Sequence, residues 1–573
     1  MQDKARRWLE QDPDPDTQAE LEKLILDNAT LELEDRFGCR LAFGTAGLRG
    51  VLGAGSNRMN RLVIRQTSAG LGKYLLEQVE DAASRGVVVG YDGRHKSEVF
   101  ALDTALVMAG LGIRVHLYNV RVPTPLVPYA IGELGAAAGV VVTASHNPPQ
   151  YNGYKVFWEN GSQIIPPHDS GIAASIERAA LVRLPWCEPE KARDDGLLVT
   201  LGDEIIAKYV ERVLALSLHP QSSARASLRI AYTPMHGVGA HIAEEVMRRA
   251  GFGQVHTVTE QREPDPNFST VQFPNPEEPG ASDLVWALAK KIGATLACAN
   301  DPDADRFSVS VKTGSGELRQ LNGDQIGAIL GADFLDHAPD NAVVGNSVVS
   351  SRLLGVIAAA RGVNHFTTLT GLKWIADAAL QHEAKGEEFI YGYEESIGYM
   401  FGALVRDKDG IAALLCFCTL AADLADRGKT VWSYLESIYR EHGLYLTRLQ
   451  TKWLTVTGKG PSAGELLRQS PPSTIAGHKV TCVTDVLTGI HGFADGRRKP
   501  VELPKSDVLI YTLEDDTRVI VRPSGTEPKL KCYYEIHGMI GDDESLDLAD
   551  ARGQRLLDDL VAAHQQELAG LSN

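Results

Sequence analysis

Cysteine is sparse in this sequence and shows no pairing pattern. Seven cysteines are scattered over 573 residues, their number is odd, and no Cys-x-x-Cys pair occurs. A disulfide framework or a cysteine-ligated zinc site needs paired or closely spaced cysteines. The pattern therefore argues against both and favours reduced thiols in a cytoplasmic protein.

The chain also lacks long apolar runs and an excess of positive charge. The longest mainly apolar stretch, Ile411 to Ala422, is too short to cross a bilayer and predicts a buried helix. The first residues, MQDKARRWLEQDPDPD, have no apolar core of a secretory signal. The net charge of -17 argues against nucleic acid or an anionic membrane as the main partner. Local basic residues must therefore hold any anionic ligand.

What the chain does have is a repeated alternation of strands and helices. A chain of 573 residues is too long to fold around a single hydrophobic core. Its composition, with 44% hydrophobic and 23% charged residues, is ordinary for a globular protein. Three strand and helix cycles, over 87–143, 228–299 and 342–391, predict βαβ units and largely parallel sheets. After Leu444, strand-like runs and a last helix predict a separate α+β domain. The expected domains are 1–205, 206–320, 321–443 and 444–573.

The first cycle ends in GVVVTASHNPPQYNGYKVF, residues 139–157. Its valines favour a strand, and the prolines and Asn152-Gly153 end that strand in turns. Ser145 then follows a strand end, the edge at which parallel sheets bind ligands. With His146 beside it and Lys155 shortly after, Ser145 is a candidate carrier of a phosphoryl group. The alternative is a merely turn-forming polar loop.

The second cycle ends in NDPDADR, which places three aspartates at alternating positions. Asp301, Asp303 and Asp305 offer the hard oxygen ligands that Mg²⁺ prefers, and Arg306 follows them. Carboxylates this close repel one another unless a cation neutralises them. One alternative is a solvated acidic turn. Another is a phosphatase with Asp301 as nucleophile, because such enzymes also begin with Asp-x-Asp after a strand.

Other loops carry residues suited to anions and sugars. Arg49, among the glycines of FGTAGLRG, could clamp an anion, although a glycine turn is the alternative. Lys408 could bind an anion or move a proton. The loops around Glu394 and Ser396 and around Thr370 and Gly371 could contact a sugar. The alternative is that the first is an ordinary turn and the second an ordinary helix start. The side chains and amides of Arg522, Ser524, Gly525 and Thr526 could together bind a phosphate. The alternative is a simple β-turn.

Together these loops resemble the α-D-phosphohexomutase family, with four motifs in the family's order from FGTAGLRG to RPSGTEPK. TLTGLKW and GYEESIGYM resemble the branch of type-2 phosphoglucomutases and phosphopentomutases. The resemblance implies an α/β fold of three related α/β domains with mixed, largely parallel sheets. A C-terminal α+β domain of the TATA-box-binding-protein-like class would complete it around a central cleft. Ala46 stands where the family often has serine.

The resemblance also implies roles for the candidate residues. Ser145 would be the phosphoserine, and Mg²⁺ would be held by a phosphate oxygen of that serine with Asp301, Asp303 and Asp305. Glu394 and Ser396 would contact sugar hydroxyls. The non-reacting phosphate would be bound by Arg522, Ser524 and Thr526. The reacting centre would be lined by Arg49, His146, Lys155, Arg306 and Lys408.

The implied activity is that of a phosphosugar mutase that interconverts sugar 1-phosphate and 6-phosphate, with glucose as the first expectation. A phosphoserine and a sugar 1,6-bisphosphate intermediate would carry the reaction. Alternatives are a phosphopentomutase, a phosphomannomutase or a glucose 1,6-bisphosphate synthase. An Asp301 phosphatase and a non-catalytic sugar-phosphate binder are remoter ones. The expected partners are small sugar phosphates, with no nucleic acid or membrane, and the expected assembly is a monomer or weak dimer.

Overall fold

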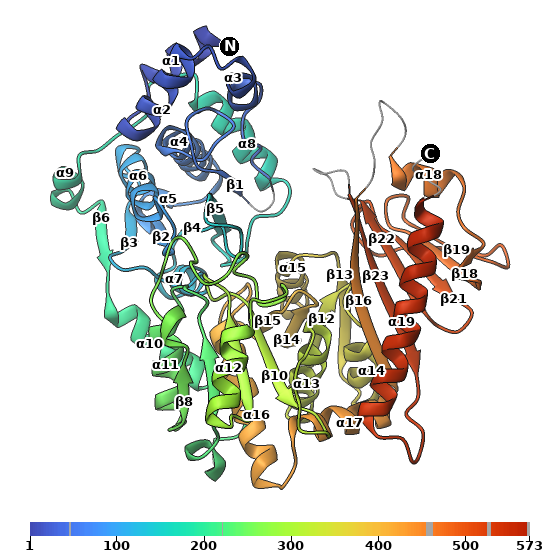
Figure 1. Cartoon of the computed structure of the whole chain (residues 1–573). Helices are drawn as coiled ribbons and strands as arrows, with labels where there is room; N and C mark the ends of the chain where they lie inside the picture. The colour runs from blue at the N-terminus through green and yellow to red at the C-terminus, as the bar shows by residue number, and fades with distance from the viewer. Residues whose placement is uncertain (45–46, 221, 454–461, 524–528, 570–573) are drawn as a thin grey trace. The chain divides into compact units, whose positions relative to one another are not determined.

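The computed structural model describes residues 1–44, 47–220, 222–453, 462–523 and 529–569. Its contacts divide the chain into two compact units (Figure 1). Unit 1 comprises Met1–Ser310 and Gly398–Asp426, and unit 2 comprises Val311–Ile397 and Arg427–Asn573. The four domain boundaries expected from the sequence stay a prediction.

The first sheet of unit 1 has the strand order β1-β5-β4-β2-β3-β6. Strands β2, β3, β4 and β6 pair in parallel, while β5 is antiparallel to both β4 and β1. The valines of β2 and β4 are fully buried, as expected for parallel strands covered on both faces. The strands are β1 (Leu48–Val51), β2 (Val87–Tyr91), β3 (Val115–Tyr118), β4 (Ala138–Val142), β5 (Tyr151–Trp158) and β6 (Leu198–Leu201).

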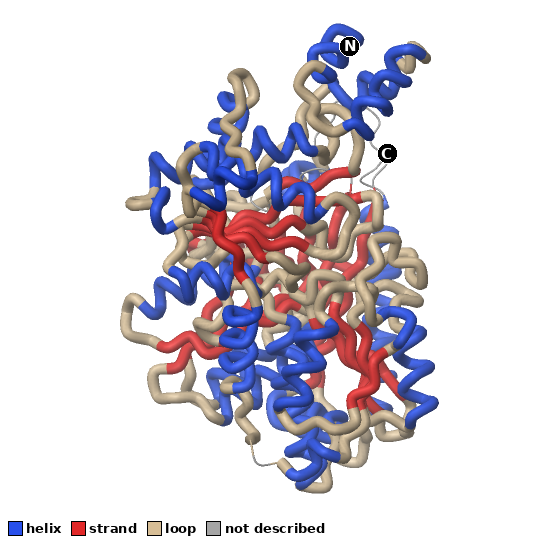
Figure 2. Tube along the Cα trace, turned by 90° about the vertical axis from the view of Figure 1, so that its left-hand side faces the viewer, coloured by secondary structure: helices blue, strands red, loops and turns tan. Residues whose placement is uncertain are grey.

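Helices surround this sheet, and Figure 2 shows strand layers accompanied by helices. Three short helices form the lead-in, and Trp8 and Phe37 from it join the hydrophobic core of the sheet. The lead-in helices are α1 (Gln2–Leu9), α2 (Pro15–Leu26) and α3 (Thr30–Phe37). The others are α4 (Arg61–Gln78), α5 (Ala82–Arg85), α6 (Ser97–Gly110), α7 (Leu126–Leu134), α8 (His168–Ala179), α9 (Pro189–Asp194) and α10 (Asp203–Leu214).

The second sheet of unit 1 places parallel β8, β7 and β9 beside β10. Its strands are β7 (Ile230–Thr233), β8 (Val255–Thr257), β9 (Leu296–Asn300) and β10 (Phe307–Lys312). Its helices are η1 (Ser223–Ala226), α11 (Ala240–Arg249), η2 (Thr259–Gln261) and α12 (Asp283–Ile292). The chain later returns to unit 1 as β15 (Gly398–Phe401) and α16 (Gly410–Asp426), and the apolar stretch expected to be a buried helix lies in α16. No described helix is both long and apolar enough to cross a membrane.

Unit 2 begins with a parallel sheet in the order β13-β12-β14. Its strands are β12 (Ala342–Ser347), β13 (Asn364–Thr368) and β14 (Glu388–Glu394), and β11 (Leu318–Gln320) precedes them in the chain. Its helices are α13 (Gly323–Asp336), α14 (Leu353–Ala360), α15 (Leu372–Glu383) and α17 (Val431–His442). The third strand and helix cycle is therefore a βαβ arrangement, as predicted.

The C-terminal part of unit 2 is an antiparallel sheet in the order β16-β23-β22-β21-β18-β19-β20. The last helix, α19 (Leu546–Ala569), lies along this sheet and packs on β16 and β23 (Figure 1). The other elements are β16 (Leu444–Trp453), α18 (Ala463–Gln469), β17 (Thr474–Ile475), β18 (His478–Asp485), β19 (Ile490–Phe493), β20 (Arg498–Pro500), β21 (Leu509–Leu513), β22 (Arg518–Pro523) and β23 (Lys529–Gly538). The expected α+β class of this part is confirmed.

Candidate functional site

Ser145 lies on a tight turn directly beyond the end of β4. Its backbone is left-handed, with φ of 52°, and its amide donates to Thr143 Oγ1 at 2.8 Å. Non-glycine residues seldom adopt this conformation, and those that do are often found at functional sites. The Ser145 hydroxyl is 3.0 Å from Asp301 Oδ2 and 3.2 Å from His146 Nδ1. The serine loop and the aspartate loop, far apart in sequence, therefore meet within unit 1.

Asp301, Asp303 and Asp305 follow β9 and are fully buried. One carboxylate oxygen of each lies within 4.8 Å of the others. Lys155 Nζ donates to Asp303 Oδ2 and Asp305 Oδ2, both at 2.8 Å. The Oδ1 atoms of Asp303 and Asp305 are buried without a hydrogen-bond partner among the described residues. Three clustered carboxylates with two unsatisfied oxygens fit a hard divalent cation, which offers the oxygen coordination that hydrogen bonds leave unmet.

Burial and neighbouring charges set the protonation of this trio. Burial opposes ionisation of Asp303, but the Lys155 ammonium outweighs it and holds the pKa of Asp303 below its usual range. Burial, together with the charges of Asp303 and Asp305, raises the pKa of Asp301 well above its usual range. Without a cation, Asp301 therefore keeps its proton to a higher pH than an ordinary aspartate does.

Basic side chains surround the serine and the trio. Lys408 Nζ lies 3.4 Å from Asp305 Oδ2, and Arg49 Nη1 donates to Asn147 Oδ1 at 2.8 Å. The Arg306 amide donates to Asp301 Oδ1 at 3.0 Å. Burial, and then the charges of Arg306 and Arg49, lower the pKa of His146, so its ring is neutral near pH 7. This arrangement can hold a multiply charged anion next to the serine hydroxyl.

Arg94 is a neighbour of the serine loop that the sequence interpretation missed. Its guanidinium, 4% exposed, donates to the carbonyls of Ser145 and Asn147 at 2.5 Å each. It also donates to the carbonyls of Pro148 at 3.0 Å and Tyr151 at 3.2 Å. Four carbonyls on one rigid fork fix the course of the loop. The available signal was its position just after β2, the parallel neighbour of β4.

Two more contacts were missed because they join distant segments. Thr124 Oγ1 donates to Asp303 Oδ2 at 2.7 Å. Tyr209 on α10 donates its hydroxyl to the carboxylate of Asp409, at 2.8 Å and 2.9 Å to the two oxygens. Asp409 also accepts from the first amides of α16, and burial raises its pKa to about 6. These bonds anchor the loop that presents Lys408.

Unit 2 contains the residues that are expected to bind the sugar. Glu394 ends β14, and its two oxygens accept from the amides of Gly371 at 2.5 Å and Leu372 at 3.1 Å, where α15 begins. Thr370 precedes this helix start, and Ser396 follows Glu394 and is half-buried. The Glu394 carboxylate thus caps α15 and lies at the positive end of the helix dipole.

The candidate phosphate loop is described only at its start. Arg522 lies on β22 and is half-buried. Ser524, Gly525 and Thr526 lie outside the described residues, as does Ala46 of the first motif. Leu369, just before the start of α15, and Tyr533 of β23 share one hydrophobic cluster. The Glu394 loop and the C-terminal sheet are therefore parts of one packed unit.

Comparison with known proteins agrees with this arrangement. The chain matches the phosphoglucomutase/phosphomannomutase family in alpha/beta/alpha domain I over residues 40–183, domain II over 207–314 and domain III over 322–442. It matches the C-terminal domain of that family over residues 497–538.

Similar whole proteins point the same way. A probable phosphoribomutase of Schizosaccharomyces pombe is 38% identical, with 94% of each chain covered. Human glucose 1,6-bisphosphate synthase is 34% identical, with 97% of this chain and 93% of that protein covered. The crystal structure of a putative phosphomannomutase from Thermus thermophilus matches at a TM-score of 0.65 and 25% identity, over 90% of this chain and 99% of that one. The chain therefore belongs to the phosphoglucomutase/phosphomannomutase family, whose members are mutases of the isomerase class.

Proposed function

We propose that this enzyme moves a phosphoryl group between the anomeric and the terminal hydroxyl of a sugar phosphate, with Ser145 as the carrier. The observation that carries the proposal is the Ser145 hydroxyl 3.0 Å from Asp301, beside three buried carboxylates and several cations. Phosphoryl transfer depends on in-line positioning and on neutralising spread negative charge. In this proposal, the cluster in unit 1 would meet both requirements.

The aspartate trio would hold Mg²⁺ together with a phosphate oxygen on Ser145. When bound, the cation neutralises part of the phosphoryl charge and orients its oxygens. Lys155, Lys408 and Arg306 balance the remaining negative charge around that group. Arg49 reaches the same loop through Asn147.

In the first half-reaction the bond between phosphorus and Ser145 Oγ breaks, and a bond to the free sugar hydroxyl forms. The acceptor hydroxyl loses its proton to a basic group of the cluster, for which the neutral ring of His146 is the candidate. The sugar bisphosphate then reverses its orientation and returns its other phosphate to Ser145. A phosphoserine carries about -1.5 to -2 charge, which explains the number of cations nearby.

Unit 2 would recognise the rest of the substrate. Glu394, Ser396 and the Thr370-Gly371 turn would bind sugar hydroxyls. Arg522, with Ser524, Gly525 and Thr526, would bind the phosphate that is not transferred. Because the bisphosphate reverses, this second group must accept either phosphate. We further propose a cytoplasmic enzyme that acts as a monomer or weak dimer.

The decisive experiment compares Ser145→Ala with Ser170→Ala, a matched change of an exposed serine in unit 1. Conversion of glucose 1-phosphate to glucose 6-phosphate, with glucose 1,6-bisphosphate and Mg²⁺ present, should vanish in the first variant and persist in the second. Full mutase activity of Ser145→Ala would overturn the proposal. Phosphate release by that variant, lost in Asp301→Asn, would instead support an aspartate phosphatase.

A pentose phosphate is the second candidate substrate. The S. pombe relative is named a probable phosphoribomutase, and a mouse relative, 35% identical, is named phosphopentomutase. Rates with glucose, mannose and ribose 1-phosphates, compared as kcat/KM, separate the candidates. The glucose assignment fails if ribose 1-phosphate is preferred by tenfold or more, which is about 1.4 kcal/mol in transition-state binding.

A further inference from the structure

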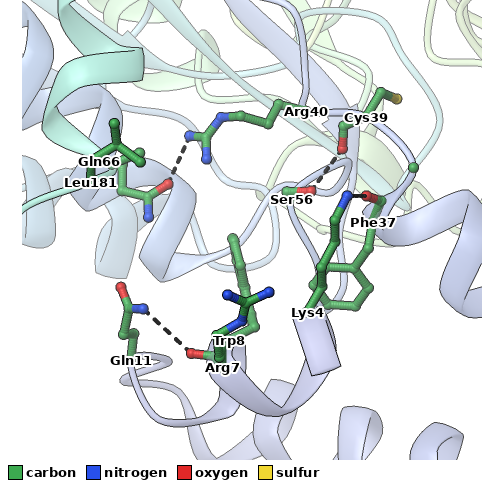
Figure 3. Close-up of a pocket in the computed structure, with 12 residues that line it drawn as sticks. Lys4, Arg7, Trp8, Gln11, Phe37, Cys39, Arg40, Ser56, Gln66 and Leu181 are labelled. Atoms are coloured by element: carbon green, nitrogen blue, oxygen red, sulfur yellow. Dashed lines mark hydrogen bonds between the residues drawn. The ribbon is translucent and has the colours of Figure 1, made fainter. Parts of the chain in front are cut away.

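A basic pocket lies in unit 1 among the lead-in helices, α4 and the end of α8 (Figure 3). Its volume is about 460 Å³, within the range of sites that hold one small molecule. None of its lining residues is assigned to the reaction proposed above. We call it the lead-in pocket.

The charge of the lead-in pocket is opposite to that of the chain. Lys4, Arg7 and Arg40 line it, and no carboxylate does so among the described residues. The chain as a whole carries a net charge of -17, so this concentration of cations is a local exception. Cations gathered around a cavity whose lining contains no carboxylate favour an anionic occupant.

One of the three cations is held in place by a buried partner. Arg40 Nη2 donates at 2.7 Å to Oε1 of Gln66, whose side chain on α4 is 3% exposed. Arg40 Nε pairs with Glu177 at 3.3 Å, and Glu177 lines an adjoining cavity of its own. Arg7 donates through Nε to the Asp3 carbonyl at 3.3 Å. Among the described residues, the two terminal amino groups of Arg7 have no protein partner, so its fork is open to a ligand.

An apolar wall faces these cations. Trp8 and Phe37 line the pocket and pack edge to face, with ring centroids 5.8 Å apart. Leu181 extends this wall and is 86% exposed. A ligand that satisfies both sides needs a phosphate for the arginine forks and an apolar part for the wall.

We propose that the lead-in pocket binds a small organic phosphate and serves as an effector site distinct from Ser145. The segment that forms its floor is tied down, because Ser56 Oγ donates to the Cys39 carbonyl at 2.7 Å. The same segment continues to Arg49, which contacts Asn147 beside Ser145. Occupation of the pocket is therefore expected to change the rate of the reaction at Ser145.

The test uses the whole chain and calorimetric titration with phenyl phosphate, in the presence of Mg²⁺ and saturating glucose 1,6-bisphosphate to fill the Ser145 site. Arg7→Gln and Arg40→Gln should each weaken binding about tenfold, equivalent to about 1.4 kcal/mol. Arg6→Gln is the matched control, since Arg6 lies on α1 but does not line the pocket. Arg7 is exposed, so its substitution leaves folding intact.

Equal binding in wild type, Arg7→Gln and Arg40→Gln would overturn the site, as would the absence of any binding under these conditions. Inorganic phosphate should bind more weakly than phenyl phosphate, and equal affinities would refute the role of the apolar wall. Phenyl phosphate should change the mutase rate of wild type more than that of Arg7→Gln. Binding with no such difference would refute the effector role. The binding measurement does not depend on the reaction at Ser145, so it succeeds or fails separately from the proposed function.

Discussion

The two units hold their candidate site residues in different ways. In unit 1 the reactive groups contact one another: Ser145 contacts Asp301, and Lys155 bridges Asp303 and Asp305. In unit 2 the Glu394 carboxylate instead contacts backbone amides of its own unit. The difference indicates that the proposed chemical centre is preassembled, whereas Glu394, the proposed sugar ligand, also serves as a structural cap. Each carboxylate oxygen can accept two hydrogen bonds, so Glu394 can keep its cap while binding a sugar.

The largest effect is expected where the reactive groups of unit 1 hold each other. Lys155→Met should lower the free energy of unfolding by about 3–5 kcal/mol, because it leaves buried carboxylates without their cation. It should also abolish mutase activity. Urea unfolding measures the loss in the presence of a chelator, and added Mg²⁺ should recover part of it.

Lys208→Met is the control for Lys155→Met. Lys208 pairs with Glu133 at 3.0 Å, but its side chain is 50% exposed, so the change should cost far less stability than Lys155→Met. Equal stability of Lys155→Met and wild type in chelator would show that the trio needs no neutralising charge. Mutase activity that is indifferent to chelation would remove the proposed metal.

The next largest effect is expected at Arg94, which shapes the serine loop. Arg94→Ala removes the donor to four carbonyls and should cost about 2–4 kcal/mol of stability, since a lost charged hydrogen bond leaves its buried partners unsatisfied. It should also lower kcat more than it raises KM, because the loop presents Ser145, the proposed phosphoryl carrier. Arg85→Ala is the control, because this arginine also donates to carbonyls but its side chain is 31% exposed. An unchanged kcat in a folded Arg94→Ala enzyme would contradict this positioning role.

A smaller effect is expected at the helix cap of unit 2. Glu394→Gln removes the charge at the start of α15 and should cost about 0.3–1 kcal/mol of stability. If the same carboxylate binds the sugar, KM should rise by at least about tenfold while kcat changes less. Glu395→Gln serves as a neighbouring control, because Glu395 accepts from Ser347 and Ser350 at 3.2 Å each. A larger rise in KM for that control would reassign the sugar contact.

The last expected effect is a pH dependence confined to unit 2. Burial lowers the pKa of His564 to about 4, and its ring contacts the Tyr534 hydroxyl at 2.9 Å. The folded state favours the neutral ring. The contribution of this ring to the free energy of unfolding is therefore complete above pH 6.5 and is lost as the pH falls toward 4. The loss amounts to about 3 kcal/mol. Unfolding measured between pH 7 and 5 should be less pH-dependent in His564→Gln than in wild type and the exposed control His241→Gln.

The sequence predicted the elements that local pattern determines. Buried valines identified β2 and β4, and the polar loops after β4 and β9 identified Ser145 and the aspartate trio. Because the carboxyl ends of strands carry ligands in α/β proteins, the meeting of these two loops could be expected.

Contacts made across long stretches of chain could not be predicted in the same way. Arg94 donates to carbonyls, which leave no residue pattern behind. Tyr209 meets Asp409 only because residues 398–426 return to unit 1. The amide partners of Glu394 likewise depend on where α15 begins, which a sequence fixes only to within a few residues.

That return also constrains the order in which the protein matures during synthesis. The ribosome releases Ser145 and the aspartates long before residues 398–426, which supply Lys408 and the buried helix α16. Unit 1 cannot close its core until part of unit 2 has already emerged. A nascent or truncated chain that stops short of α16 thus carries Ser145 and the aspartates but lacks Lys408, so the proposed phosphoryl chemistry begins only once most of the polypeptide exists.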